Sequence, residues 1–180
     1  MSTGILYKLK WKVSFNVLKS LYFAFVHPHL LYGIEVYGNS SLSHLNKLII
    51  LKNKLLRIVQ NKSFRTSVIE LYRNFNTLPL PELHQFPLLC LVHKYLHCRS
   101  QLPIVFSKYF TLNKDIHHYN TRSTENLHLT RVNTARGVRN IKFKASQLWN
   151  TLPEVLKSVP KISIFKKCLK HYLLSDSVLV

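Results

Sequence analysis

The sequence predicts an all-α protein: a bundle of amphipathic helices, followed by a basic irregular arm and a short C-terminal helix. Apolar residues recur at helical spacing through most of the chain. Serines and prolines divide this pattern into segments of ordinary helix length. One long stretch, 117–153, has no sustained helical pattern. Between Glu125 and Glu154 it carries five cations and no acid, which predicts a cationic arm.

The composition is that of a folded and strongly basic protein. Its 47% hydrophobic and 12% aromatic residues exclude a disordered tail. The 26 Lys and Arg residues outnumber the 7 Asp and Glu residues and give a formal net charge of +19. Such an excess indicates a polyanionic partner, which is either nucleic acid or a membrane surface. Basicity alone does not choose between them.

The N-terminal third divides into helices in order. Residues 4–13 predict a short helix, with a strand as the alternative because Leu6 and the following lysines alternate. Residues 14–27 predict an amphipathic helix, and Pro28 starts or kinks the next piece, which ends near Tyr37.

The clearest helical pattern runs over 43–60, with Ser41 or Ser43 as its cap, and it carries the first candidate site residues. Lys47, Lys54 and Arg57 lie on its polar face, where the alternatives are a solvated face or phosphate contact. Lys52 falls inside the apolar stripe. It is either a side chain that snorkels at the edge of the core or a cation beside a phosphate backbone.

Shorter helices follow over 66–75 and 81–96, the second with an expected kink at Pro87. The second helix and its end carry four side chains of types that bind zinc: Cys90, His93, His97 and Cys98. No second ligand pair follows at the spacing of a zinc finger. We therefore interpret them as core residues and expect no metal.

The arm of residues 117–153 is the second candidate region. Its pieces HYNTRS and WNTLP combine aromatic rings, a guanidinium and small polar side chains, which a nucleic-acid strand uses for stacking, phosphate and sugar contacts. The alternative is a loop that packs its aromatic residues onto the helices and leaves its cations in water. The candidate residues of the arm are Tyr119, Asn120, Arg122, Arg131, Arg136, Arg139, Lys142, Lys144 and Trp149.

Two helical turns, at 145–149 and 154–159, are expected near the end of the arm and after it. Ser163 then caps a last amphipathic helix that ends near Leu174. We expect two domains: a helical domain over 1–112, and the basic arm with the C-terminal helical segment over 113–180.

The acids are too scattered for metal-dependent catalysis. No two of the seven are closer than ten residues in sequence, whereas a two-metal site needs several converging carboxylates. The four glycines form no phosphate-binding loop. Triads of Ser, His and Asp meet only in space, so spacing does not test them. We expect no enzymatic activity from this chain, and no cofactor.

The location expected from the sequence is intracellular. Three cysteines without framework spacing predict reduced thiols. Lysines interrupt the apolar N-terminus, so it predicts no export signal. The longest apolar region, 17–37, contains Lys19, Glu35, two histidines and a proline. It therefore predicts a buried helix rather than a membrane span, and we expect no membrane partner.

An ordered set of motifs carries a family resemblance. LYFAFVHPHLLYG at 21–33 is similar to the pattern LY...V.P.L.YG. Residues 45–58 are similar to L..L...Q.R.LR.I, with Lys52 in place of the usual Gln. YNTRS at 119–123, WNTLP at 149–153 and SIFKKCLK at 163–170 complete the set. Over residues 4–174 the chain resembles the carboxy-terminal thumb and connector region of reverse transcriptases from non-LTR retrotransposons of the LINE type, such as the jockey-like elements.

The resemblance implies a thumb-like helical module that grips template RNA and product DNA. In the family the catalytic palm, with its Asp-Asp metal site, lies upstream, so polymerisation by this chain alone is not implied. The expected partners are RNA, DNA or their hybrid, and the polymerase palm. A nuclear location follows if the chain acts with an element. The chain then looks like a fragment of a mobile element. The alternative is a helical packing or protein-interaction module with no independent nucleic-acid function.

Overall fold

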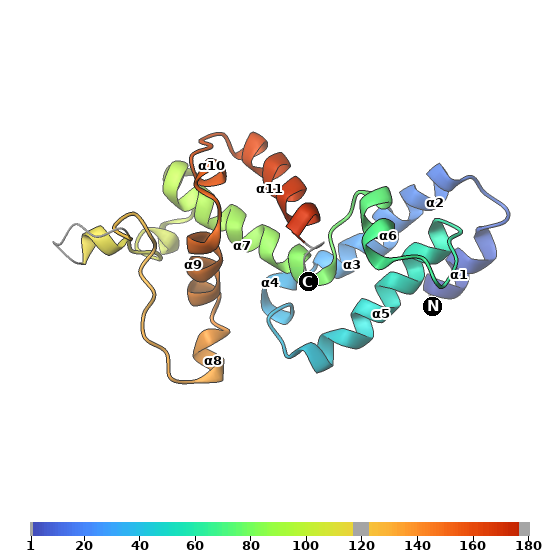
Figure 1. The fold of residues 1–180 in the computed structure, drawn as a ribbon, viewed down its shortest axis with the longest axis horizontal. Helices are drawn as coiled ribbons and strands as arrows, with labels where there is room; N and C mark the ends of the chain where they lie inside the picture. Colours follow the sequence, from blue (N-terminus) through green and yellow to red (C-terminus); the bar gives the residue numbers. More distant parts are fainter. Residues whose placement is uncertain (1, 117–122, 177–180) are drawn as a thin grey trace. The chain divides into compact units, whose positions relative to one another are not determined.

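Helices make up the fold of this chain in a computed structural model (Figure 1). The structure describes residues 2–116 and 123–176. Within these ranges no strand forms, and the only β-type pairing is an isolated antiparallel bridge between Leu112 and Leu127. The all-α prediction is therefore confirmed. The chain divides into two compact units: unit 1 is Met1–Leu83 with Leu173–Val180, and unit 2 is His84–Tyr172.

The first part of unit 1 contains four helical elements before a break at Gly33. They are α1 (Ser2–Leu9), α2 (Phe15–Leu21), the π-helical turn η1 (Tyr22–Val26) and α3 (His27–Leu31). The π turn directly precedes Pro28, which lacks an N–H and cannot continue a regular α-helical ladder. Gly33 has a φ of 65°, a value that glycine adopts easily, and it separates α3 from α4 (Ile34–Tyr37). The helix predicted over 14–27 thus forms, but the piece up to Tyr37 is two helices.

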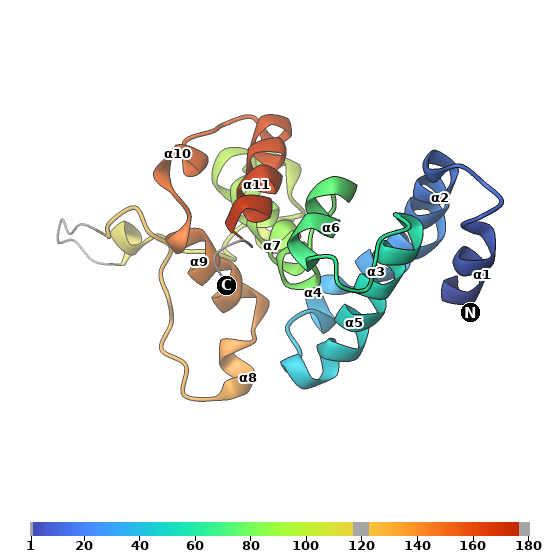
Figure 2. The same ribbon diagram turned by 45° about the vertical axis from the view of Figure 1, so that its right-hand side comes forward.

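Two longer helices complete most of unit 1. They are α5 (Leu42–Val59) and α6 (Val68–Phe75), within two residues of their predicted starts. Both α1 and α6 lie along α5, as Figure 2 shows. Polar bonds join α6 to α5: the Tyr72 hydroxyl donates to Asn53 Oδ1 at 2.7 Å, and Gln60 Nε2 donates to the Leu71 carbonyl at 3.0 Å.

The core of unit 1 is partly aromatic. The buried rings of Tyr22 and Phe75 meet edge to face at 5.1 Å between centroids. Phe23 stacks on Phe75 at 5.5 Å. Such pairs add to the free energy that comes from burial of apolar area, so η1 is fixed against α6.

Unit 2 is built around α7 (Leu80–His97), most of which belongs to it. This helix continues through Pro87 as one element, and the kink expected at Pro87 stays a prediction. The elements that follow are η2 (Arg99–Gln101), η3 (Ile104–Phe106), η4 (Asn113–Asp115), α8 (Ala135–Val138), α9 (Ile141–Thr151), α10 (Glu154–Lys157) and α11 (Ile162–Asp176). Because α11 begins at Ile162, Ser163 lies inside the helix and is not its cap.

The structure corrects the prediction of an irregular arm over its second half. From Ala135 onward the chain is mostly helical, in α8 and α9. The Thr134 side chain accepts a hydrogen bond from the Gly137 N–H at 3.0 Å, and the Asn140 side chain accepts one from the Lys142 N–H at 2.9 Å. These caps start two helices whose apolar stripes are too short to detect from periodicity.

The core of unit 2 explains where the units divide. On α7 the buried His93 ring stacks on Phe165 of α11 at 4.2 Å between centroids, and Trp149 of α9 lies 5.9 Å from Phe165. These contacts tie most of α7 to the C-terminal helices. The second compact unit therefore begins at His84, and the division into domains expected at residue 112 stays a prediction.

Candidate nucleic-acid interface

Four predicted cations lie close together in the sequence where α8 leads into α9. Arg136 and Arg139 lie on α8 and at its end, and Lys142 and Lys144 lie in the first turn of α9. We call these four residues the α8–α9 cluster. Gly137 allows α8 to form closely against the preceding segment, because a Cβ there would lie 3.0 Å from Val132 Cγ1. The cluster thus spans nine consecutive residues that contain the end of α8 and the capped start of α9.

The α8–α9 cluster lies where two helix starts carry no acid. Neither α8 nor α9 has an acid in its first turn, although the N-terminal end of a helix favours negative charge. Three ion pairs of the described residues are Lys62–Glu70, Lys114–Glu125 and Lys157–Glu154. Arg136, Lys142 and Lys144 take part in none of these three pairs. Lysines in the first turn of a helix repel its positive end, so an anion bound there would relieve an unfavourable arrangement.

The segment that leads into the cluster is held by Asn150. The Leu127 N–H donates to Asn150 Oδ1 at 2.9 Å, and Asn150 Nδ2 donates to the Leu127 carbonyl at 2.8 Å. On the other side, the His128 N–H donates to the Thr111 carbonyl at 2.8 Å. The exposed Arg131 follows four residues after Leu127. Sequence analysis missed this role of Asn150, for which the WNTLP motif was the one available signal.

The structure corrects the stacking role considered for Trp149. Its side chain is 3% exposed and packs near His93 and Phe165. No ring face is open to a base, so Trp149 belongs to the core, as the packing alternative predicted. Three other candidates of the arm, Tyr119, Asn120 and Arg122, lie outside the described residues.

The candidates on α5 behave differently from one another. Lys47 and Lys54 are exposed and lie seven residues apart, on one side of the helix. Arg57 is half-buried: its Nη2 donates to the Thr66 carbonyl at 3.2 Å, and its guanidinium lies 5.8 Å from the centre of the Phe64 ring. Arg57 therefore holds the loop after α5, while the two lysines are open to a ligand.

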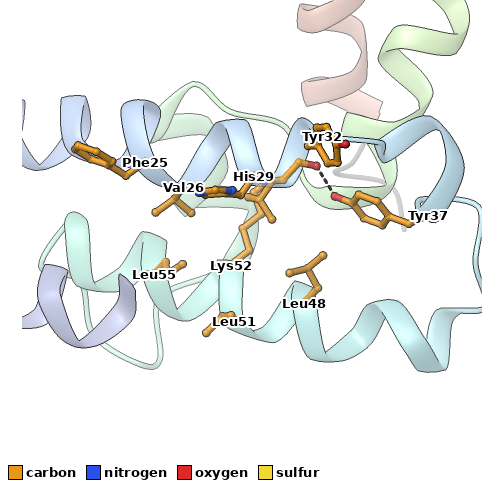
Figure 3. A pocket seen from close by; sticks show the side chains of 10 residues that line it. Phe25, Val26, His29, Tyr32, Tyr37, Leu48, Leu51, Lys52 and Leu55 are labelled. Atoms are coloured by element: carbon orange, nitrogen blue, oxygen red, sulfur yellow. Dashed lines mark hydrogen bonds between the residues drawn. The ribbon is translucent and has the colours of Figure 1, made fainter. Parts of the chain in front are cut away.

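Lys52 is neither a snorkelling side chain nor a phosphate contact, which corrects both interpretations. It is 1% exposed. Its Nζ donates to the Leu78 carbonyl at 2.5 Å and lies 5.1 Å from the centre of the Tyr72 ring. Burial lowers the pKa of Lys52 to about 7, against an opposite influence of Glu82. Figure 3 shows the side chain extending from α5 toward the segment that carries His29.

The cysteine and histidine side chains of α7 have structural partners. Burial raises the pKa of the Cys90 thiol to about 11. His93 Nε2 donates to the Val159 carbonyl at 2.6 Å, and His97 Nε2 donates to the Lys157 carbonyl at 3.1 Å. Among the described residues, no three metal-ligating side chains gather into a group. Cys90, Cys98 and Cys168 form no disulfide.

No helix within the described ranges combines the length and the apolar character needed to cross a membrane. Family models, curated proteins and solved structures provide no match to this chain. The resemblance to reverse transcriptases therefore rests on the sequence motifs.

Proposed function

We propose that this chain is a nucleic-acid-binding module in which the α8–α9 cluster holds a phosphate backbone. One observation carries the proposal: four cations lie within nine residues, on α8, at its end and in the first turn of α9, and the first turns of both helices lack an acid. Guanidinium groups bind phosphate through paired hydrogen bonds, and ammonium groups bind it as point charges.

Each unit also carries further candidate cations of its own. In unit 2 the exposed Arg131 precedes the cluster, and in unit 1 Lys47 and Lys54 contribute from α5. Tyr119, Asn120 and Arg122 remain candidates for stacking, sugar and phosphate contacts on the strength of the YNTRS motif. Since lysine and arginine would bind phosphates, which every sequence carries, binding is electrostatic and weakly specific.

The ordered motifs support a more particular origin for the module. The chain is the carboxy-terminal part of a retrotransposon RNA-directed DNA polymerase of the LINE or jockey-like type, without the catalytic palm. Its ligand is then an RNA:DNA hybrid, and its protein partner is the palm. Because the acids are few and separated, this chain alone does not extend a primer, and a primer-extension assay should give no product.

Fluorescence anisotropy with a labelled RNA:DNA hybrid across a salt series tests the proposal. The logarithm of the binding constant should fall linearly with the logarithm of salt concentration. Each phosphate contact contributes a slope of roughly −0.9 on duplex DNA. Lys142→Gln with Lys144→Gln should therefore reduce the steepness by about 1 to 2.

A matched double variant provides the control. Lys62→Gln with Lys114→Gln makes the same chemical change at two lysines that are already paired with acids. It should leave the salt dependence nearly unchanged. The proposal fails if the hybrid does not bind at low salt, if binding is insensitive to salt, or if both double variants lose the same affinity.

A further inference from the structure

Unit 1 carries a groove whose apolar floor the proposed function does not use, although it shares the rim residues Lys47 and Lys54. A pocket of about 510 Å³ lies among η1, α3, α4 and α5, and eight of its ten lining residues are aliphatic or aromatic. A second pocket of about 390 Å³ extends toward α1 and shares Phe25, Val26 and His29 with the first. We call the two pockets together the α1–α3–α5 groove.

The aromatic wall of the groove is exposed to an unusual degree. Phe25, His29 and Tyr32 follow one another at intervals of four and three residues and all line the first pocket. Phe25 is 64% exposed and Tyr32 is 87% exposed. The buried Val26 and Leu30 line the same pocket, so this stretch has one broad apolar face that is only partly covered. Large exposed apolar side chains that gather around a pocket indicate a binding surface.

The rim of the groove is positively charged. On α5, Lys47, Leu51 and Lys54 are four and three residues apart, so a pocket-lining leucine lies between two exposed lysines. On α1, Lys8 directly precedes the pocket-lining Leu9. The elements α1, α2, η1, α3 and α5 contain no Asp or Glu, and α4 contributes one acid, Glu35. The groove therefore offers apolar contacts along its floor and two lysines along its α5 edge.

We infer that the α1–α3–α5 groove docks an α-helix of a partner protein that has one apolar face flanked by acidic residues. Apolar anchors spaced over seven residues of such a helix span about 10 Å. They would cover Leu48, Leu51 and Phe25, while flanking carboxylates would meet Lys47 and Lys54. This charge complementarity also steers association.

Two other occupants fit less well. A nucleic-acid strand would meet the lysines, but its phosphates and sugars would not fill a floor of aliphatic side chains such as Leu48 and Leu55. A second copy of this chain would bring a like charge, because residues 1–83 contain eleven Lys and Arg residues but three acids. A partner helix with acidic flanks satisfies both the apolar floor and the cationic rim.

A designed peptide tests this inference directly on the full chain. We would use a fluorescein-labelled helix of about 18 residues, a length of about 27 Å, with leucines on one face and glutamates beside them. It should bind saturably. Two matched peptides, one with the leucines changed to serine and one with the glutamates changed to lysine, should each bind at least about tenfold more weakly, which corresponds to about 1.4 kcal/mol. Equal binding of all three would overturn the inference.

Variants of the protein locate the site. Phe25→Ser with Tyr32→Ser, both exposed, should weaken peptide binding about tenfold or more and leave the melting curve unchanged. The matched control is Ile104→Ser with Val105→Ser, which removes two exposed apolar side chains from unit 2. Equal losses in the two pairs, or no loss in the first, would refute the assignment.

Competition separates this inference from the proposed function. Lys142→Gln with Lys144→Gln should weaken binding of the RNA:DNA hybrid and spare binding of the peptide. If the hybrid displaces the peptide and also loses affinity in the Phe25 and Tyr32 variant, the groove is a nucleic-acid surface and the inference is wrong. If sedimentation shows that the wild type is a dimer and that the Phe25 and Tyr32 variant is a monomer, the groove instead binds a second copy of the chain.

Discussion

Lys52 in unit 1 and His93 in unit 2 are both buried hydrogen-bond donors, but they differ in the charge that the side chain normally carries. Each projects from an 18-residue helix and donates a hydrogen bond to a backbone carbonyl far away in sequence, of Leu78 and Val159 respectively. Each is buried beside an aromatic ring. A basic side chain thus fixes a connecting segment in both units.

The difference lies in the charge that must be buried. A lysine at neutral pH is normally an ammonium ion, and its desolvation lowers the pKa of Lys52 from 10.5 to about 7. A histidine can donate while neutral, so burial costs it less. The comparison teaches that a chain rich in cations can use a basic side chain as a buried hydrogen-bond donor. A buried lysine makes the free energy of unfolding depend more strongly on pH than a buried histidine does.

The two units should therefore respond to pH in different ranges. Between pH 7 and 10.5 the unfolded chain holds a proton on Lys52 that the folded chain has partly lost, so the free energy of unfolding rises with pH. Burial also lowers the pKa of His93 below 6.5. Its contribution to stability is therefore lost as the pH falls below about 6.5 and is nearly constant above it.

The largest effect should come from removing the donor of unit 2. His93→Ala should cost about 3 kcal/mol, because it leaves a cavity beside Phe165 and an unpaired Val159 carbonyl. Hydrogen exchange of the α9 and α11 amides would measure the loss. His97→Ala, at an exposed neighbouring site, should cost less than about 1 kcal/mol. Similar costs at both positions would contradict the role given to His93.

The pH contrast between the units can be tested with Lys52→Met, which keeps most of the side-chain volume. Between pH 6 and pH 9 the wild type should gain about 2 to 3 kcal/mol of unfolding free energy relative to this variant. Guanidinium unfolding at each pH would show it. Lys54→Met, at an exposed lysine, should follow the wild type at every pH. If the difference between Lys52→Met and wild type stays constant over this range, Lys52 is not a buried base.

A smaller effect is expected from Asn150→Asp, which tests whether unit 2 depends on uncharged hydrogen-bond donors. Asn150→Asp keeps the shape but cannot donate to the Leu127 carbonyl, and its charge repels that oxygen. We expect a loss of about 1 to 2 kcal/mol, seen as a lower melting temperature. Asn133→Asp adds the same charge at an exposed position of the same unit. A comparable decrease in both variants would assign the effect to charge rather than to the lost hydrogen bond.

The fold was predictable where a helix has a long and regular stripe. The start of α5 was predicted within one residue and the start of α6 within two, since caps and periodicity act over a few neighbouring residues. The arm was predicted less well. In α9, four of the first six side chains are lysine, alanine or serine, so the stripe carried by Trp149 is weak. Its burial depends on Phe165, sixteen residues later, which no local pattern reveals.

The candidate site shows the same division. Lys142 and Lys144 were identified from charge alone, and the structure adds that they lie on a capped helix start. Lys52 was recognised as lying in an apolar stripe, but full burial was not predicted because a lysine side chain is normally charged. The exposed aromatic wall at Phe25 and Tyr32 was not identified, because aromatic residues at helical spacing have the same pattern in the sequence whether they are buried or exposed.

By itself the sequence determined that the chain is helical, where its strongest helices lie and how much positive charge it must carry. These properties depend on side-chain type and on spacing within a few turns. Only the tertiary structure decided which basic and aromatic side chains become buried. Burial depends on partners distant in sequence, such as the Leu78 carbonyl for Lys52 and Phe165 for Trp149.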